Sequence, residues 1–306
     1  ALAQFRMTTT ITGKFDGYVN DFDLKGIRFS TTDTDGFADK PTSHNGGISG
    51  ELDGSVTGLP DSYAMMVNAN VHKLTFSTHG LEKFVKGWAP SVNLDLDKFC
   101  KGERLTFRGR ASGPLNRLHA HGTMHTDFGK ADLNVTLRNV IDSNRPLEIG
   151  GSASTERLDI GRIMAGIPVG ECDMRTGLNA TFAKDSLGIV IDSLYVDGLD
   201  VLGYKYSNIA AVGTFSQDAF DGRIVCSDPN LNFLFQGIFS LSSKTKNALY
   251  QFYANLGYAD LHALNIDKRG VSKMSLSTQA NFTRISGEDI IGNISIKDVM
   301  LEDEHG

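Results

Sequence analysis

The chain has few of the residues that mark a disulfide-rich or membrane-spanning protein. Its three cysteines, Cys100, Cys172 and Cys226, are an odd number at wide spacing, which gives neither a disulfide framework nor a CxxC metal or redox site. Cys226 shares its strand parity with the apolar Ile224, so we expect the cysteines to be small buried side chains. No apolar run approaches the roughly 18 residues that a membrane helix needs.

Basic residues form no run along the sequence, and the formal net charge is −6 with a pI near 5.7. Binding to a phosphate backbone needs clustered Lys and Arg, so we expect no nucleic-acid partner. The sequence also lacks a Gly-x-Ser-x-Gly elbow, a phosphate loop, an HExxH motif and a CxxC motif. We therefore expect no enzyme and no cofactor.

What the chain does have is a period-two alternation of apolar and polar residues over most of its length. The clearest run covers residues 274–283, and similar runs cover 105–108, 118–125 and 132–138. Alternation of this kind puts the apolar atoms on one face of a strand and the polar atoms on the other. The sequence therefore predicts a long β-sheet with one wet face, whose apolar face needs another sheet or a ligand to cover it.

Glycine is abundant and proline is scarce, at 33 and 7 residues. Asp-Gly and Asn-Gly pairs suit tight hairpin turns, and we expect turns at Asp16-Gly17, Asp35-Gly36, Asn45-Gly46-Gly47, Asp53-Gly54, Asp197-Gly198 and Asp221-Gly222. Other glycines continue an alternating run, as Gly109, Gly122 and Gly292 do, and there they predict a bulge or bend. A sheet that bends in this way curls into a trough.

Only residues 79–88 and 158–165 have a helical pattern, with apolar residues three and four apart. Each is at most two or three turns long, so it can plug one end of a sheet but cannot cover a whole face. A contiguous exposed apolar patch of more than a few hundred Å² usually marks a binding surface. This is the physical argument for a lipid-like ligand.

The predicted fold is all-β, with long antiparallel strands curled into an open U-shaped trough and one or two short helices. We expect one continuous groove over residues 1–306 from a larger protein, with a possible subdivision into 1–145 and 146–306. Phospholipid acyl chains would lie on its floor. The residues predicted to line that floor have the apolar parity of the clearest runs: Leu118, Met124, Leu133, Val135, Leu137, Ile189, Ile191, Phe233, Phe235, Phe252, Leu276, Phe282, Ile294 and Ile296.

Several short motifs resemble a known family. They include Gly203-Tyr204-Lys205-Tyr206, the stretch from Asp228 to Gly237, residues 258–266, Gly292-Asn293-Ile294-Ser295-Ile296, and Gly109 to Leu115. Together they resemble the AsmA-like repeats of the TamB family, and the resemblance is spread over most of the chain. It implies a periplasmic protein of a Gram-negative bacterium, anchored in the inner membrane by a segment outside this sequence, with an Omp85-type outer-membrane barrel as partner. The implied role is to move phospholipid between the two membranes in support of outer-membrane biogenesis, and the family offers no catalytic residues to transfer.

Two other functions fit the same alternation. A structural or adhesin-like β-sandwich would seal its apolar face inside and bind protein or glycan on its surface. A periplasmic scaffold would help to assemble outer-membrane proteins by adding strands to a free sheet edge. The sequence does not separate the scaffold from a lipid conduit.

Three sets of residues resemble a metal site, a catalytic pair and glycosylation sites, but each has a simpler interpretation. His119, His121 and His125 share one strand parity, and same-face neighbours lie roughly 6.5–7 Å apart, so His119 and His121 are the only pair able to hold one Zn²⁺ without a bend. We interpret them as a solvated strand face and expect no metal.

The paired acids Asp95 with Asp97 and Asp21 with Asp23 fit the solvent-exposed side of a strand better than the catalytic pair of a hydrolase. Four Asn-x-Ser/Thr sequons, at Asn134, Asn179, Asn281 and Asn293, are polar strand residues in a bacterial protein.

Overall fold

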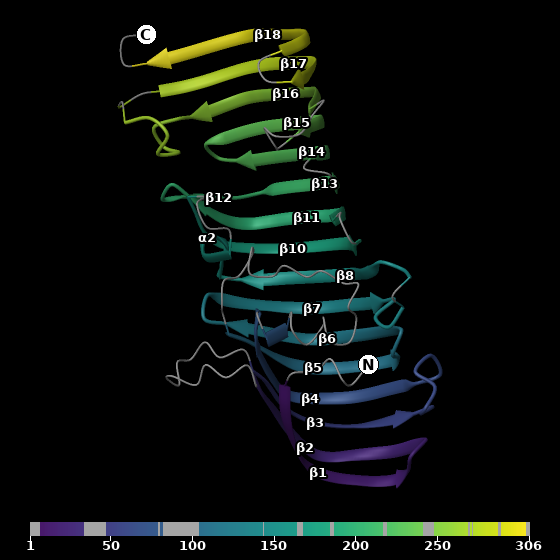
Figure 1. Cartoon of the computed structure of the whole chain (residues 1–306). Helices are drawn as coiled ribbons and strands as arrows, with labels where there is room; N and C mark the ends of the chain where they lie inside the picture. The colour runs from purple at the N-terminus through teal and green to yellow at the C-terminus, as the bar shows by residue number, and fades with distance from the viewer. Residues whose placement is uncertain are drawn as a thin grey trace. The chain divides into compact units, whose positions relative to one another are not determined.

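The chain forms two compact units in a computed structural model (Figure 1). Unit 1 comprises Ala1–Gly166 with Ala180–Asp185, and unit 2 comprises Ile167–Asn179 with Ser186–Gly306. The structure describes residues 7–33, 47–78, 80–81, 104–142, 144–163, 168–183, 187–216, 219–240, 248–268, 270, 272–286 and 289–303.

Unit 1 contains an antiparallel meander in which each strand from β1 to β8 pairs with the next along the chain. The strands are β1 (Met7–Tyr18), β2 (Asp21–Asp33), β3 (Ile48–Thr57), β4 (Met66–Ser77), β5 (Arg104–Pro114), β6 (Arg117–Thr126), β7 (Gly129–Arg138) and β8 (Leu147–Glu156). The short β9 (Leu158–Asp159) and the single helical turn α2 (Ile160–Ile163) follow.

Unit 2 is also an antiparallel meander. Its strands are β10 (Val169–Phe182, of which the last three residues group with unit 1), β11 (Leu187–Val201), β12 (Tyr204–Tyr206), β13 (Ile209–Ser216), β14 (Ala219–Asp228), β15 (Leu231–Ser240), β16 (Ala248–Asp260), β17 (Ser272–Ser286) and β18 (Asp289–Asp303). β11 pairs with both β12 and β13, and from β13 onward each strand pairs with the next.

The predicted fold class is confirmed. The described residues are almost all in β-strands, and in each unit the long strands form an antiparallel, open sheet. The helix predicted over 158–165 is present only as α2, over Ile160–Ile163. Of the helix predicted over 79–88, Gly80 and Leu81 are helical, and the rest lies outside the described residues. No helix in the described part of the chain is long and apolar enough to cross a membrane.

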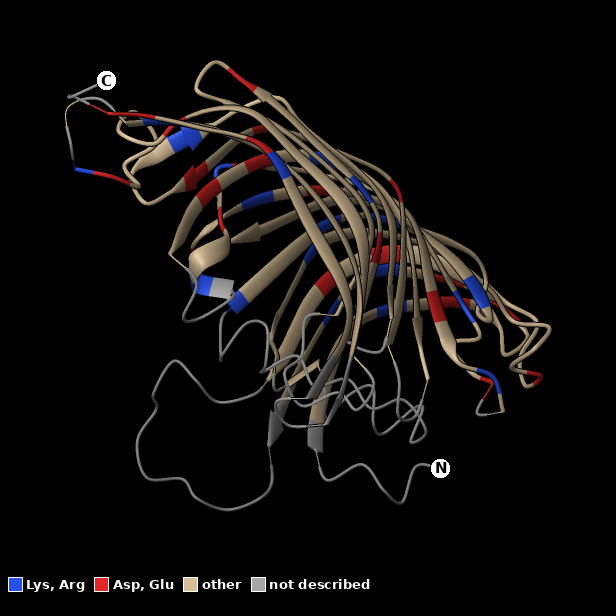
Figure 2. Ribbon diagram, turned by 90° about the horizontal axis from the view of Figure 1, so that it is seen from above, with Lys and Arg blue, Asp and Glu red and all other residues tan. Residues whose placement is uncertain are grey.

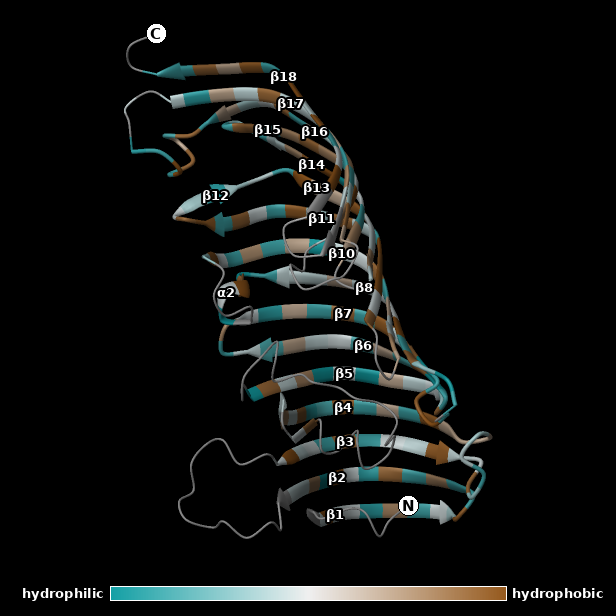
Figure 3. Cartoon of the chain, turned by 45° about the horizontal axis from the view of Figure 1, so that its top comes forward, coloured by the Kyte–Doolittle hydropathy of each residue, from teal (hydrophilic) through white to brown (hydrophobic). Residues whose placement is uncertain are grey.

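The strand registers carry the sequence alternation from one strand to the next. In unit 1, Leu118 lies opposite Leu137, and Met124 lies opposite both Phe107 and Ala131. Directly opposed residues project from the same side of a sheet, so each unit has one apolar face, and in unit 1 the opposite face is largely polar. Hydrophobic and hydrophilic bands alternate along the strands in Figure 3.

Four of the predicted Asp-Gly turns are wrong, because Gly17, Gly54, Gly198 and Gly222 lie inside strands. A Cβ on Gly54 would come within 2.2 Å of the Asn68 carbonyl oxygen, so the close approach of the next strand requires glycine there. The turns predicted at Asp35-Gly36 and Asn45-Gly46 lie outside the described residues. The hairpins that the structure describes turn elsewhere, as at Pro229-Asn230 between β14 and β15.

Rows of glycine cross the apolar faces. Gly109 lies opposite Gly122 in unit 1, and Gly213, Gly222 and Gly237 follow one another across β13, β14 and β15 in unit 2. A Cβ on any of these five residues would lie 2.2–2.5 Å from a carbonyl oxygen of the neighbouring strand. The neighbouring strand therefore leaves no room for a side chain at these five positions. The strands as a whole arch rather than run straight, as Figure 2 shows. The β5–β6 residue pairs continue through Gly109 and Gly122, and the β17–β18 pairs through Gly292, without a register shift, so the bulge or bend expected at these glycines stays a prediction.

Candidate functional site

The five predicted floor residues of unit 1 lie on one face of the adjacent strands β6 and β7. Leu118 and Met124 belong to β6, and Leu133, Val135 and Leu137 belong to β7. All five side chains are half-buried. Among the described residues of unit 1, each long strand contacts the strands next to it along the chain, and no second sheet packs over this face. The face is therefore a single layer whose apolar side chains retain partial exposure.

One part of the apolar face of unit 1 has a packed core of its own. Ile48, Phe76 and Phe107 are buried, and Leu81 packs against them from the helical turn that follows β4. The turn thus covers one part of the sheet, as predicted for a short helix. Met124 of β6 packs against the same buried cluster, and β7 contributes no residue to it.

The apolar face of unit 2 carries a cluster of aromatic rings from the four neighbouring strands β14, β15, β16 and β17. Phe235 on β15 lies 6.1 Å from Phe220 on β14 and 5.3 Å from Phe252 on β16, measured between ring centroids. Tyr250 stacks on Phe282 of β17 at 4.6 Å with an interplanar angle of 15°. Aromatic pairs at these separations are attractive beyond the area they bury. The cluster therefore makes a continuous and ordered apolar surface.

Exposure increases along this face from the middle of the sheet toward β18. Phe235 is 8% exposed, whereas Ile294 and Ile296 of β18 are 57% and 59% exposed. The remaining predicted floor residues of unit 2, all half-buried and on the same face, are Ile189, Ile191, Phe233, Phe252, Leu276 and Phe282. The registers therefore place all of them on one face with Phe235, Ile294 and Ile296, while what that face binds stays a prediction.

One end of the face in unit 2 is closed by a second cluster. Tyr206, Ala259 and Leu264 are buried together, and Leu264 belongs to the turn between β16 and β17. The neighbouring segment from Tyr204 to Ser207 is held by the buried carboxylate of Asp228. This carboxylate accepts hydrogen bonds from the Tyr204 hydroxyl at 2.5 Å and from the Ser207 amide at 2.9 Å. Packed side chains and hydrogen bonds therefore cover this end of the face, which we call the closed end.

The environment of Asp228 also sets its charge. Burial alone would raise the pKa of this carboxyl, but hydrogen bonds from the Tyr204 hydroxyl, from the Asn230 and Ser207 amides and from the Ser207 hydroxyl hold the pKa below its ordinary value. Asp228 is consequently ionised at neutral pH, and its hydrogen bonds come from Tyr204 on β12 and from the loop residues Ser207 and Asn230. We interpret it as a structural anchor of the closed end.

The sequence did not single out several residues of this face. Phe220, Phe239 and Tyr250 belong to the aromatic cluster but were not among the predicted floor residues, although each shares the parity of an apolar strand run. The position of each residue in the apolar–polar alternation could therefore have placed it on this face. What the sequence does not show is the cross-strand register that brings these rings together.

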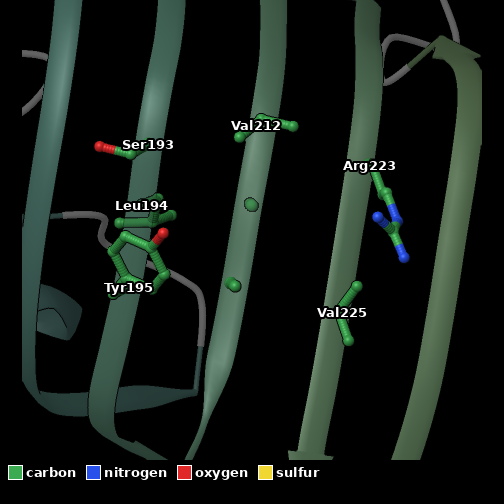
Figure 4. Close-up of a pocket in the computed structure, with 8 residues that line it drawn as sticks. Ser193, Leu194, Tyr195, Val212, Arg223 and Val225 are labelled. Atoms are coloured by element: carbon green, nitrogen blue, oxygen red, sulfur yellow. The ribbon is translucent and has the colours of Figure 1, made fainter.

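The opposite face of unit 2 has a small apolar recess of about 120 Å³, shown in Figure 4. It is lined by Ser193, Leu194, Tyr195, Ala210, Ala211, Val212, Arg223 and Val225 from β11, β13 and β14. Tyr195 and Val212 are 54% and 47% exposed at its rim. The recess is smaller than a typical small-molecule pocket of about 300–1,000 Å³.

The His, Asp and Cys residues considered for metal binding or catalysis do not form one site among the described residues. His119, His121 and His125 are exposed, and among the described residues no group of three or more His, Cys, Asp or Glu side chains is placed to hold a metal ion. Asp21 and Asp23 are exposed strand residues, whereas Asp95 and Asp97 lie outside the described residues. The predicted burial of cysteine is confirmed for Cys172 and Cys226, and Cys100 is also outside that part of the chain.

Comparison with known proteins gives no relative from which a function can be transferred. No family model, no curated protein and no solved structure matches the chain.

Proposed function

We propose that this chain is a non-enzymatic lipid conduit, in which phospholipid acyl chains lie along the apolar faces of the two units. The observation that carries the proposal is the single-layer apolar face itself. In unit 2 it joins the aromatic cluster around Phe235 to exposed Ile294 and Ile296 without a second sheet over it in the described residues.

The physical chemistry favours a flexible apolar ligand. Full burial of one methylene group stabilises a complex by about 0.8 kcal/mol. Ten methylenes lying on the face would therefore contribute at most about 8 kcal/mol, and less where their outer side stays in water, before the cost of ordering the ligand. The face offers a strip of hydrocarbon with few polar partners. An acyl chain fits such a strip better than a polar substrate would.

The cellular setting follows only from the resemblance of the sequence to TamB-type proteins. On that basis we propose a periplasmic location in a Gram-negative bacterium, attachment to the inner membrane through a segment outside this sequence, and an outer-membrane barrel as partner. Transport between the membranes would then support outer-membrane biogenesis.

A second candidate function rests on strand β18. This strand pairs with β17 on one side, and its side chains Ile291, Ile294 and Ile296 are more than half exposed. A sheet edge of this kind can accept an added strand from another protein. A scaffold for outer-membrane protein assembly would use this edge, whereas a lipid conduit would use the face.

The test compares two double substitutions on the same strand. Val135→Asp with Leu137→Asp places two carboxylates on the apolar face, and Asn134→Asp with Thr136→Asp places the same two groups on the polar face. We expect the first pair to abolish binding of a fluorescent long-chain phospholipid and the second pair to retain it, with the strand content of each variant checked by circular dichroism. Equal loss in both folded variants would overturn the conduit proposal.

A further inference from the structure

A cationic surface lies on the polar face of unit 1, opposite the apolar face. Strands β4, β5 and β6 contain no Asp and no Glu, although the chain as a whole is acidic. Their basic side chains are all exposed: Lys73, Arg104, Arg108, Arg110 and Arg117, together with His72, His119, His121 and His125. We call this set the β4–β6 cationic surface.

The strand registers explain how these residues gather. Arg110 on β5 lies opposite both Asn70 on β4 and His121 on β6, and Arg108 lies opposite Thr123. Alternate residues of one strand share a face, so arginines separated by an apolar or small residue form no run in sequence yet meet on the surface. For this reason the sequence alone did not suggest the surface.

Basic side chains on the neighbouring strands β2 and β7 form ion pairs, whereas the arginines of β5 and β6 named below form none with described residues. Arg28 on β2 pairs with Glu51 on β3 at 3.2 Å, and Lys130 on β7 pairs with Asp132 at 3.3 Å. Among the described residues, no carboxylate lies within salt-bridge distance of Arg108, Arg110 or Arg117. An external anion therefore meets uncompensated guanidinium groups here.

The surface also contains a polar recess of about 300 Å³ between β3, β4 and β5. Arg110, Asn68 and Asn70 supply hydrogen-bond donors to it, and Asp53 lies at one side. The Asp53 carboxylate is already engaged, since it accepts the Gly26 amide at 2.6 Å and lies 2.6 Å from His72 Nε2. Asp53 keeps its negative charge at one side of the recess, and the lining groups that suit a phosphate are the Arg110 guanidinium and the side-chain amides of Asn68 and Asn70.

From this arrangement we propose that the β4–β6 cationic surface binds the anionic headgroups of a phospholipid bilayer surface, with a lipid phosphate in the recess beside Arg110. Four of the five permanent cations are arginine, whose planar fork of donors matches phosphate oxygens.

The side chains around the cations favour a bilayer over other anions. β4, β5 and β6 present no Tyr, Trp or Phe on the polar face, so the surface lacks both the aromatic anchors of a protein interface and the stacking platform of a single-stranded nucleic-acid site. Mobile headgroups need neither, because they rearrange to meet fixed cations. The β4–β6 cationic surface lies on the opposite side of the sheet from the proposed acyl-chain floor, so the two proposals are tested separately.

The experiment is flotation of the whole chain with vesicles of phosphatidylcholine, with and without 30% phosphatidylglycerol. Each Lys or Arg near an anionic surface strengthens binding about fivefold at low salt. The triple variant Arg108→Gln, Arg110→Gln and Arg117→Gln should therefore bind the phosphatidylglycerol vesicles roughly 100-fold more weakly. The control triple Lys14→Gln, Arg223→Gln and Lys297→Gln removes the same charge from exposed strand positions elsewhere and should bind like the unmodified chain.

Two further measurements test headgroup binding without relying on the triple variant. Binding by the unmodified chain should fall steeply as salt is raised, because exposed charges are screened, and this test needs no variant. The Val135→Asp, Leu137→Asp variant should keep its vesicle binding even if it loses acyl-chain binding. Equal binding to both kinds of vesicle, no binding to either, or binding to soluble poly-glutamate but not to vesicles would each overturn the proposal, and the last would indicate an acidic protein partner.

Discussion

The ring of Phe107 on β5 covers Gly122 on β6, so that a Cβ on Gly122 would lie 2.8 Å from the ring Cζ atom and 2.7 Å from the Gly109 Cα. The same relationship recurs in unit 2, where a Cβ on Gly222 would lie 2.7 Å from the Cζ atom of Phe220. An aromatic ring that covers an inter-strand glycine supplies the apolar contact that glycine lacks. Each of these two glycines is thus covered by the ring of a phenylalanine.

Replacing Gly122 by valine should destabilise unit 1. The new side chain would have to displace backbone atoms as well as the Phe107 ring, and overpacking of this kind costs about 1–3 kcal/mol or more. The urea midpoint of unfolding, followed by circular dichroism, should fall clearly. Gly188→Val is the control, because Gly188 is also in a strand but has no heavy atom within 4 Å of an added Cβ, and its midpoint should change little.

Asp228 provides a pH-dependent test of the closed end of unit 2. Its pKa is lowered in the folded state, so its contribution to stability is fully present above the unfolded pKa near 3.9 and is lost as the pH falls through the lower folded pKa. Asp228→Asn should lower stability at pH 7 by about 1–3 kcal/mol and should flatten the dependence of the unfolding midpoint on pH below about 4.

The matched control for this experiment is Asp221→Asn on the same strand. Asp221 is exposed, so the substitution should leave both the midpoint at pH 7 and its pH dependence nearly unchanged. Similar curves for the two variants would show that the hydrogen bonds of Asp228 do not stabilise the closed end.

The two described cysteines should resist thiol reagents in the folded protein. Burial, followed by the nearby negative charge of Asp173, raises the pKa of Cys172 to about 11, and burial also raises the pKa of Cys226. With Cys100 replaced by serine, the native chain at pH 8 should react only slowly with Ellman's reagent, whereas the unfolded chain should release two equivalents of thiolate dye. Rapid reaction of both thiols in the native state would contradict their burial.

The sequence predicted the fold class because period-two alternation is a local property of each strand. It placed Val135 and Leu137 with Leu118 on one face, and the registers do the same. It misplaced the Asp-Gly turns, because a glycine required by close strand approach, such as Gly54, looks the same in sequence as a glycine required by a turn.

The sequence was less informative about which strands lie next to one another. Strand neighbours bring Arg110 beside His121 and Phe235 beside Phe252, and neither contact is visible without the register. Absence of a basic run was a sound argument against a linear basic motif. It did not apply to a sheet, in which basic residues on three strands meet on one face.

The most direct measurement of the central claim is native mass spectrometry of the gently purified chain, followed by solvent extraction and identification of lipid in the same sample. The lipid-conduit proposal predicts bound phospholipid that is absent from the Val135→Asp, Leu137→Asp variant and retained by the Asn134→Asp, Thr136→Asp variant. A ligand-free mass for the unmodified chain, with no uptake of added fluorescent phospholipid, would contradict it.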